Sequence, residues 1–401
     1  MRATRAIIHL DNLRFNINEI KKLIPQGTKI CFPVKADGYG HGAVDLAKVA
    51  LEQGIYCLAV ATVDEGIFLR NAGLECPIML FSLPCLEELD LLVKHNLTPF
   101  VFEEYFVEEL DKSAKKFNKI INVHIKIDTG MSRIGCDYTE VLSLAQKIKS
   151  LSNLNLQGLG THLCVSDSIK KDDIKFTLSQ ISKIDKSVKI LNENFTKGQI
   201  SKISKAVDIL HKNNIYPEIV HCAASGGVLM YPNAIFDMIR PGILFYGYFP
   251  DEIVKKYLNK HKKDVPLLKP VMELETRIET IKKISKGQSV SYGRTWKAKK
   301  DTYLATIPIG YADGLLRQFS SKLKVKINDK MYPIVGRICM DQCMIDLGES
   351  TDVKIWDKVT IFGPVNSDEV GNTAQTLANL AKTIPYEITC SVDKRVPRDY
   401  V

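Results

Sequence analysis

Five unusual polar residues come at the ends of short apolar runs of the sequence: Lys35, Lys126, His162, Ser225 and Arg240. Any one of them is more often part of an ordinary turn, or a satisfied structural group, than part of a site. The apolar runs, however, have the length of buried strands. If the strands are parallel, their carboxyl ends lie at one edge, where barrel enzymes carry their active sites.

Glycines beside two of these residues indicate a phosphate site. Gly226 and Gly227 follow Ser225, and Gly242 precedes Ile243. Backbone N–H groups are open to a ligand where no Cβ covers them, and barrels commonly bind phosphate after their last two strands. A lysine after the first strand, whose pKa falls on burial, is suited to form an imine with a carbonyl compound. Pyridoxal phosphate meets both demands, but a Schiff-base aldolase acting on a phosphorylated sugar would use the same parts.

Short apolar runs alternate with longer amphipathic stretches over the first 248 residues. Eight strands are predicted, at 29–34, 57–61, 78–80, 98–102, 121–127, 156–161, 218–221 and 236–239. Apolar residues recurring at i, i+3 and i+4 predict helices between them, at 43–52, 86–94, 103–117 and 139–149. Eight such units within 11–248 predict an α/β fold of the TIM (β/α)8 barrel type. A doubly wound sheet remains the alternative, because periodicity does not report closure.

The pattern changes after residue 250. Alternating apolar residues predict strands at 273–284, 322–327, 332–338, 342–347 and 353–362, with a turn at Asn328 and Asp329. We therefore expect a C-terminal, mostly β domain over 265–401. Residues 1–10 precede the first helix and resemble a strand without a barrel partner, so we expect them to join this second domain.

The composition is that of an ordinary globular protein, with 401 residues, 45% hydrophobic and 25% charged. No apolar run approaches the ~18 residues that a membrane span needs, and the first residues lack a signal-peptide pattern. We therefore expect a cytoplasmic protein with no membrane partner. The ten cysteines are scattered through apolar segments, which favours free thiols over a disulfide framework.

The formal net charge of +9 is concentrated in one segment with a helical pattern. Residues 169–212 hold ten lysines against five acidic residues. No nucleic-acid-binding motif accompanies them, which favours a solvated helical face over a site for a polyanion. We expect no nucleic-acid partner.

Eight segments, in order along nearly the whole chain, resemble sequence blocks of the alanine racemases, bacterial pyridoxal-phosphate enzymes with a barrel and a β domain. They are 34–42 (VKADGYGHG), 126–135 (KIDTGMSRIG), 160–162 (GTH), 240–247 (RPGILFYG), 289–295 (SVSYGRT), 310–314 (GYADG), 335–342 (VGRICMDQ), and 386–387 (YE) with 395–398 (RVPR). Any one block could occur by chance, but eight in order make the likeness specific.

The resemblance implies an isomerase that interconverts L-alanine and D-alanine and supplies D-alanine for peptidoglycan. Inverting an α-carbon requires one acid/base group on each face of the cofactor imine. The family likeness supplies Lys35, which also holds the cofactor, and Tyr292, which reaches in from the partner subunit near His162. It therefore implies a homodimer with shared active sites.

Further roles are implied residue by residue, with no metal. Cofactor-binding residues besides Lys35 would be Tyr39, His162, Ser225, Arg240, Gly242, Ile243 and Tyr386. Substrate-binding residues would be Arg133, Tyr311, Met340 and Asp341, the last two from the partner chain. Lys126 would be carbamylated and would orient Arg133. Arg240 would face the pyridine nitrogen and leave it neutral, which favours simple proton return over side reactions.

Two features depart from the family pattern. Ala224 stands where the pattern usually has Asn before Ser225, which removes one polar contact near the cofactor. The interval from His162 to His221 is longer than usual because it holds the Lys-rich helical insertion around 169–212, which we interpret as a surface feature.

Two other functions fit the sequence less well than racemisation. A decarboxylase of the same architecture is disfavoured, because such enzymes favour an acidic residue where Arg240 stands. A non-catalytic pyridoxal-phosphate carrier on a lone barrel would leave the domain after residue 250 without a purpose.

Overall fold

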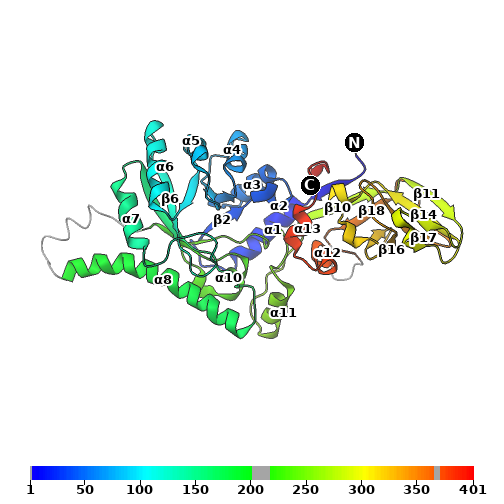
Figure 1. The fold of residues 1–401 in the computed structure, drawn as a ribbon. Helices are drawn as coiled ribbons and strands as arrows, with labels where there is room; N and C mark the ends of the chain where they lie inside the picture. The colour runs from blue at the N-terminus through cyan, green and yellow to red at the C-terminus, as the bar shows by residue number, and fades with distance from the viewer. Residues whose placement is uncertain (1, 201–216, 365–370) are drawn as a thin grey trace.

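The computed structural model describes residues 2–200, 217–364 and 371–401. Figure 1 shows two bodies side by side, a barrel of strands ringed by helices and a body built mainly of strands. Two short helices, α12 (Ala374–Ala381) and α13 (Pro385–Cys390), lie where the two bodies meet. None of the helices in the described ranges is both long and apolar enough to cross a membrane.

Eight parallel strands build the barrel sheet. They are β2 (Lys29–Pro33), β3 (Cys57–Val60), β4 (Ile78–Leu80), β5 (Thr98–Val101), β6 (Ile121–Lys126), β7 (Leu154–Gly160), β8 (Ile219–His221) and β9 (Met238–Ile239). They follow one another in chain order, and β9 pairs with β2. Between β8 and β9, the Arg240 N–H donates to the Ala223 carbonyl at 2.8 Å. The predicted TIM-type barrel is confirmed, in a nearly closed form, and the doubly wound alternative is wrong.

Helices surround this sheet, and several of them bury one apolar face against it. They are α1 (Leu10–Lys21), α2 (Lys35–Tyr39), α3 (Ala43–Glu52), α4 (Val63–Asn71), α5 (Leu89–Lys94), α6 (Glu104–Lys116), α7 (Val141–Ser150), α8 (Lys171–Ile200), α10 (Ser225–Met230) and α11 (Glu252–Lys260). In α6, for example, Phe106, Leu110 and Ala114 recur every fourth residue and are all buried. This spacing is why the sequence predicted the helix to within one residue at each end.

The strand-rich body is built on one nine-stranded sheet with a small hairpin beside it. Its strands are β1 (Arg5–Ile8), β10 (Met272–Arg277), β11 (Thr280–Ile284), β12 (Ser289–Val290), β13 (Trp296–Lys297), β14 (Thr302–Ile307), β15 (Lys324–Ile327), β16 (Lys330–Val335), β17 (Cys343–Gly348), β18 (Lys358–Phe362) and β19 (Arg398–Tyr400). β1 pairs with β10 and with β19, so segments from both ends of the sequence meet in this sheet.

Two local predictions in this body had different outcomes. Asn328 and Asp329 both have positive φ, 45° and 64°, and form the tight turn of the β15–β16 hairpin, as predicted. The prediction of one strand over 273–284 is wrong, because the strand is interrupted at residues 278–279. β10 then pairs with β18, whereas β11 pairs with β14. Alternation continues across the break, which is why the sequence pattern did not reveal it.

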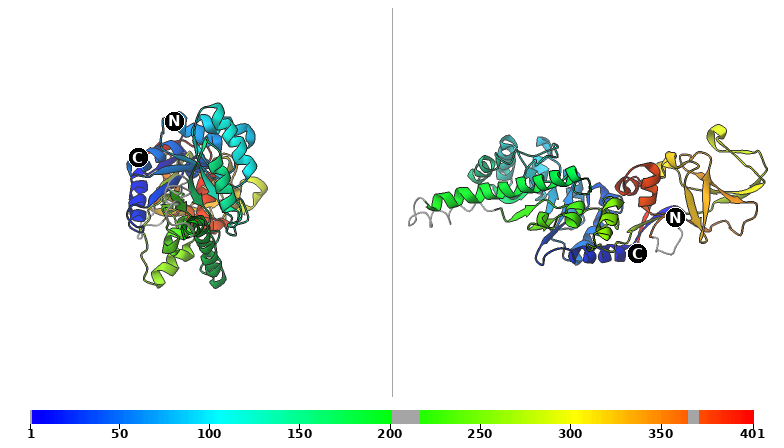
Figure 2. Two further views of the ribbon diagram at one scale, coloured as in Figure 1. Left: turned by 90° about the vertical axis from the view of Figure 1, so that its left-hand side faces the viewer. Right: turned by 90° about the horizontal axis from the view of Figure 1, so that it is seen from below.

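The Lys-rich segment begins as one long helix. α8 spans 30 residues, about 45 Å at 1.5 Å per residue, and extends beyond the barrel in Figure 2. Thr177, Gln180, Ile181 and Ile184 in its first half are buried against the barrel. The predicted helical character is confirmed as far as Ile200, and residues 201–212 of the predicted insertion lie outside the described residues.

Candidate functional site

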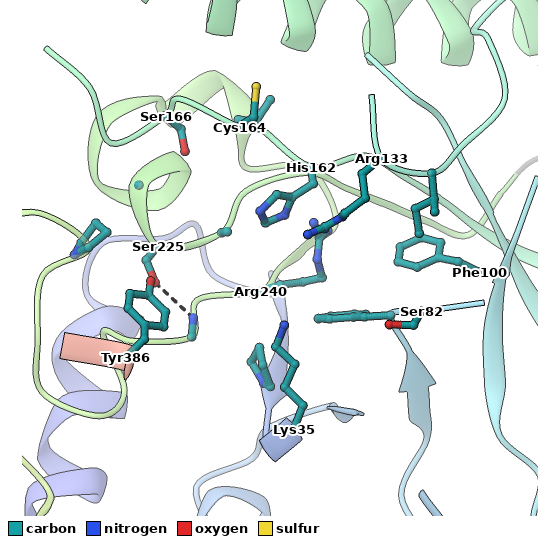
Figure 3. Close-up of a pocket in the computed structure, with 18 of the residues that line it drawn as sticks. Lys35, Ser82, Phe100, Arg133, His162, Cys164, Ser166, Ser225, Arg240 and Tyr386 are labelled. Carbon is teal, nitrogen blue, oxygen red and sulfur yellow. Dashed lines mark hydrogen bonds between the residues drawn. The ribbon is translucent and has the colours of Figure 1, made fainter. Parts of the chain in front are cut away.

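A cavity of about 490 Å³ lies at the carboxyl ends of the barrel strands (Figure 3). Nine of the residues predicted for the site line it: Lys35, Tyr39, Lys126, Arg133, His162, Ser225, Arg240, Gly242 and Tyr386. All but Tyr386 follow or end a barrel strand, and Tyr386 enters from α13 of the second body. Ile243 is fully buried and is not among the lining residues.

The backbone after Lys35 forms a left-handed turn. Residues 36–39 have φ values of 51°, 51°, 61° and 52°, although only one of them is glycine. Each non-glycine residue in this region costs roughly 1–2 kcal/mol, so the turn needs external contacts. The Glu65 carboxylate accepts the Ala36 N–H at 2.7 Å, and Asp37 accepts the Ala43 N–H at 2.9 Å. These contacts fix the backbone from which the Lys35 side chain extends.

The environment of Lys35 favours its neutral amine. Burial lowers the pKa of Lys35, and the Arg133 guanidinium lowers it further, whereas Glu65 opposes both effects. Figure 3 shows the Lys35 side chain directed into the cavity towards Arg240. A neutral lysine amine is the nucleophilic form and also the form that accepts a proton.

The cavity has an excess of basic groups. Besides Lys35 and Arg133 it is lined by Lys126 and Arg240, each only 5% exposed, whereas Asp167 is the one acidic residue among the lining residues described. Burial lowers the pKa of Lys126 to about 7, and Arg240 and Arg133 add to that shift. Burial also raises the pKa of Asp167, which weakens it as a counter-charge. The cavity therefore suits a ligand that carries several negative charges.

The acidic residue nearest Lys126 in sequence has another task. Asp128 accepts the backbone N–H groups of residues 130, 131 and 132 at 2.8, 3.0 and 3.1 Å. It thereby shapes the loop that carries Arg133. His162, at the end of the next strand, is neutral near pH 7, because burial first and Arg240 second lower its pKa to about 3.

A cradle of backbone and hydroxyl groups lies at one end of the cavity. Ser225 begins α10, whose first N–H groups have no acceptor within the helix. The Gly242 N–H donates to the Ser225 hydroxyl oxygen at 3.1 Å, and the rings of Tyr39 and Tyr386 lie 5.6 Å apart beside them. A Cβ on Gly242 would lie 2.8 Å from the Tyr39 hydroxyl, which explains the glycine. Ala224 precedes the helix and supplies no side-chain cap.

The other predicted residues form a separate, exposed group, which we call the exposed cluster: Tyr292, Tyr311, Met340 and Asp341. Tyr292, Tyr311 and Met340 are 69%, 42% and 52% exposed, and none of the four lines the cavity. Tyr311 lies on one loop, and Met340 and Asp341 lie on another. The Tyr311 N–H donates to the Cys339 carbonyl at 3.0 Å and so joins these two loops. Arg395 binds Asp341 at 2.8 Å. Tyr386 lines the cavity of its own chain, whereas Tyr311 does not.

Sequence reasoning missed several residues around the cavity. Five residues line the cavity but lie outside the eight sequence segments that resemble the family: Phe81, Ser82 and Leu83 after β4, and Cys164 and Ser166 after β7. Gln180 of α8 lies behind the lining. Its side-chain N–H groups donate to the Thr129 hydroxyl and the His162 carbonyl, both at 3.3 Å, and its oxygen accepts the Cys164 N–H at 3.2 Å. A long polar side chain beside Ile181 and Ile184 on the buried face of α8 was the available signal.

We expect Gln180→Leu to lower the free energy of unfolding by about 1–3 kcal/mol, because buried partners on two loops lose their hydrogen bonds. Urea unfolding measures the change. Ser179→Ala, at the neighbouring exposed position of the same helix, is the control and should leave stability unchanged. An equal effect of both variants would contradict a bridging role for Gln180.

Comparison with known proteins agrees with this geometry. The chain matches the family model for the alanine racemase N-terminal domain over residues 8–250 and that for the C-terminal domain over 271–400. It is 51% identical to the alanine racemase of Treponema denticola, over 100% of this chain and 99% of that protein. The solved alanine racemase of Clostridium difficile 630 has a TM-score of 0.85 at 33% identity, covering 100% of this chain and 96% of the other.

A second solved structure shares the fold but is named for a different substrate. A histidine racemase from Leuconostoc mesenteroides has a TM-score of 0.82 at 24% identity, covering 100% of this chain and 98% of the other. That likeness concerns the fold alone. Because both domain families match and close relatives share the full length, the chain belongs to the alanine racemase family and is a racemase, an isomerase.

Proposed function

We propose that the protein interconverts L-alanine and D-alanine with pyridoxal phosphate as its cofactor, and that its D-alanine supplies peptidoglycan. The observation that carries this proposal is the cavity in which Lys35 lies among Lys126, Arg133 and Arg240, with one weak acid among the lining residues described. The relatives named alanine racemase support alanine as the substrate.

The residues present fit the cofactor. Tyr39, Ser225, Gly242 and Tyr386 line the cavity and suit a phosphate, and the excess of basic groups suits its negative charge. Ile243, which is buried next to Gly242, would contribute only through its backbone. Lys35 would hold the carbonyl carbon. When bound, pyridoxal phosphate withdraws electrons from the substrate α-carbon and makes its proton removable.

Arg240 would hold the ring nitrogen. A guanidinium does not give up its proton near neutrality, so it would donate a hydrogen bond and leave that nitrogen unprotonated. His162, which is neutral, can accept a hydrogen bond beside it. These two residues favour return of a proton to the α-carbon over other outcomes.

Lys35 can serve only one face of the α-carbon, so a second acid/base group is needed. We assign it to Tyr292 of the partner subunit. Tyr292 is 69% exposed and belongs to the exposed cluster, away from the cavity of its own chain. In a homodimer the exposed cluster of one chain would complete the cavity of the other. The exposed Tyr292, Tyr311 and Met340 give that cluster the apolar character of surfaces that partners cover.

The same arrangement accounts for the substrate. Arg133 would bind the cofactor's phenolic oxygen and face the substrate, and Met340 and Asp341 would approach the substrate carboxylate from the partner chain. The ion pair with Arg395 at 2.8 Å offsets the charge of Asp341. The rings of Tyr386 and of the partner's Tyr311 would leave room for a methyl-sized side chain, which favours alanine over lysine or arginine.

We also propose that Lys126 is carbamylated. Its neutral amine, populated because the pKa is about 7, attacks dissolved CO₂, forms an N–C bond and releases one proton. The product is a carboxylate analogue between Arg133 and Arg240, where an unmodified ammonium would be repelled. Protein equilibrated with ¹³C-bicarbonate should show a carbamate ¹³C NMR signal that grows from about pH 6 to about pH 8, as the amine loses its proton. Lys126→Arg should lack the signal, and its absence from the wild type would contradict the modification.

Product analysis tests the function itself. Purified protein with added pyridoxal phosphate is incubated separately with L-alanine, L-serine, L-lysine and L-histidine, and products are separated by chiral chromatography. We expect D-alanine as the main product and little conversion of the larger amino acids. A decarboxylated amine in place of the D-isomer would contradict the proposed function.

A further inference from the structure

A line of buried side chains leads from Arg240 away from the cavity, and the proposed reaction does not use it. Nη1 of Arg240 contacts Nδ1 of His221, the last residue of β8. Nε2 of His221 lies 2.9 Å from Nδ1 of His124 on β6. Nε2 of His124 lies 3.3 Å from Oε1 of Gln157 on β7. Both histidines are at most 1% exposed.

Each contact in this line has only one possible direction. Arginine has donors but no acceptor, so Nδ1 of His221 must accept. A neutral imidazole carries one N–H, which for His221 is then on Nε2 and donates to Nδ1 of His124. By the same reasoning the N–H of His124 is on Nε2 and donates to the oxygen of Gln157. Burial, foremost, lowers the pKa of His124 to about 4 and that of His221 well below its usual value, so both rings are neutral.

The amide of Gln157 is held in the orientation that this chain of hydrogen bonds requires. Burial raises the pKa of Tyr56, and a hydrogen bond from Gln157 opposes that rise, as an N–H donated to the hydroxyl does. Oε1 is the atom of Gln157 that faces His124, which leaves the amide N–H groups of Gln157 for Tyr56.

The space for the two rings is provided by β7. A Cβ on Gly158 would lie 2.2 Å from Nδ1 of His124, and one on Gly160 would lie 2.7 Å from Cε1 of His221. The His221 ring also stacks on Phe100, with centroids 5.5 Å apart. Both rings are thus confined. A change of tautomer would move a proton from one ring nitrogen to the other and change the hydrogen bonds, without moving the ring.

Arg240 depends on this acceptor for its orientation. Its Nη2 donates to the Thr161 carbonyl at 2.7 Å, and its Nη1 contacts His221, so two separate nitrogens fix the guanidinium plane. Among the described residues no carboxylate forms an ion pair with Arg240. If the N–H of His221 were on Nδ1, it would face an N–H of Arg240, and one of the two anchors would be lost.

We propose that Gln157 is a positioning residue of this active site: its amide oxygen accepts the N–H of His124, stabilises the tautomers of His124 and His221 that Arg240 requires, and thereby keeps an acceptor facing Arg240. This inference rests on the proposed function only in the role given to Arg240 at the cofactor ring. Gln157 touches neither the cavity nor the proposed substrate, so it acts through the two histidines.

The test compares the holoenzyme with Gln157→Leu, which removes the acceptor, and with Asn155→Leu as the control. Asn155 lies two residues earlier on β7, is exposed, and bonds only Asn122 among the contacts described, at 2.8 Å. Histidine ¹⁵N NMR reports the tautomers. We expect Nε2–H at both rings in the wild type and control, and a mixture of tautomers in Gln157→Leu.

The kinetic readout separates positioning from stability. Loss of one anchoring hydrogen bond should lower kcat of Gln157→Leu about two- to tenfold, leave KM unchanged, and shift the absorbance of the bound cofactor. Gln157→Asn, whose shorter amide cannot reach His124, should behave likewise and serves if the leucine variant fails to fold. Unchanged tautomers in these variants, or changed tautomers with wild-type kcat, would overturn the proposal. A wild type that makes no D-alanine would refute the proposed function but not the NMR result.

Discussion

A Lys35→Ala enzyme is expected to lose racemisation by about a thousandfold or more, together with the visible absorbance of covalently bound cofactor. Alanine has no amine to hold the cofactor's carbonyl carbon and none to exchange a proton with the substrate. The cradle of Ser225 and Gly242 remains, so any cofactor still bound should show the spectrum of the free aldehyde. Absorbance spectra after dialysis and chiral product analysis measure the two effects.

Lys29→Ala is the matched control for this prediction. Lys29 begins β2, at the opposite end of the strand from Lys35, and its ammonium lies over the Tyr56 ring. Its removal should leave both the absorbance and the activity at the wild-type level. If the absorbance of covalently bound cofactor persisted in Lys35→Ala, the attachment site would have to be sought at another lysine.

Tyr292→Phe is expected to slow proton exchange at the α-carbon of one alanine enantiomer strongly and to spare exchange of the other. For racemisation, kcat/KM must fall equally in both directions, because the equilibrium constant between the enantiomers is unity. The asymmetry therefore appears in deuterium uptake from D₂O without inversion, which Lys35 can still perform on its own face. The lost general acid/base should slow the affected exchange by roughly 10²–10⁴-fold.

Tyr105→Phe provides the control, since Tyr105 is 59% exposed on α6 and far from both groups of site residues in sequence. Equal loss of exchange for both enantiomers in Tyr292→Phe would contradict the two-base scheme.

Mixing the two inactive variants tests where Tyr292 acts. If it acts in the partner's cavity, a heterodimer of Lys35→Ala and Tyr292→Phe chains holds one intact site. An equal mixture after subunit exchange should then regain about a quarter of the wild-type activity. If Tyr292 acts within its own chain, every site in the mixture lacks one base, and no activity returns.

The barrel could be predicted because its strands are buried on both faces and so appear as uninterrupted apolar runs. All four residues of β3, for example, are buried, and its predicted and observed limits differ by one residue. The residues that line the cavity came together for the same reason, since carboxyl ends of parallel strands share an edge. The left-handed turn at 36–39 could not be predicted, because local preferences oppose it and contacts such as that of Glu65 with Ala36 sustain it.

The residues of the exposed cluster could not be predicted from the strand pattern. Tyr292 and Met340 were found by resemblance and not by strand position, because they lie on loops of a body whose periodicity says nothing about the cavity. Neither Gln180 nor Gln157 was predicted to contribute to the site. Each acts through contacts between elements distant in sequence, such as α8 with the loops after β6 and β7. Their types are ordinary for the surfaces of helices and strands.

Because β19 is the last strand in the sequence, its pairing with β1 forms only at the end of synthesis. Arg398 in β19 donates to the Gly40 carbonyl at 2.9 Å, and so reaches across 358 residues to the turn that follows Lys35. On the ribosome, the barrel emerges long before Arg398 exists. A nascent barrel therefore lacks one anchor of the turn that follows Lys35, and we expect chains interrupted before β19 to remain inactive even when their barrels are complete.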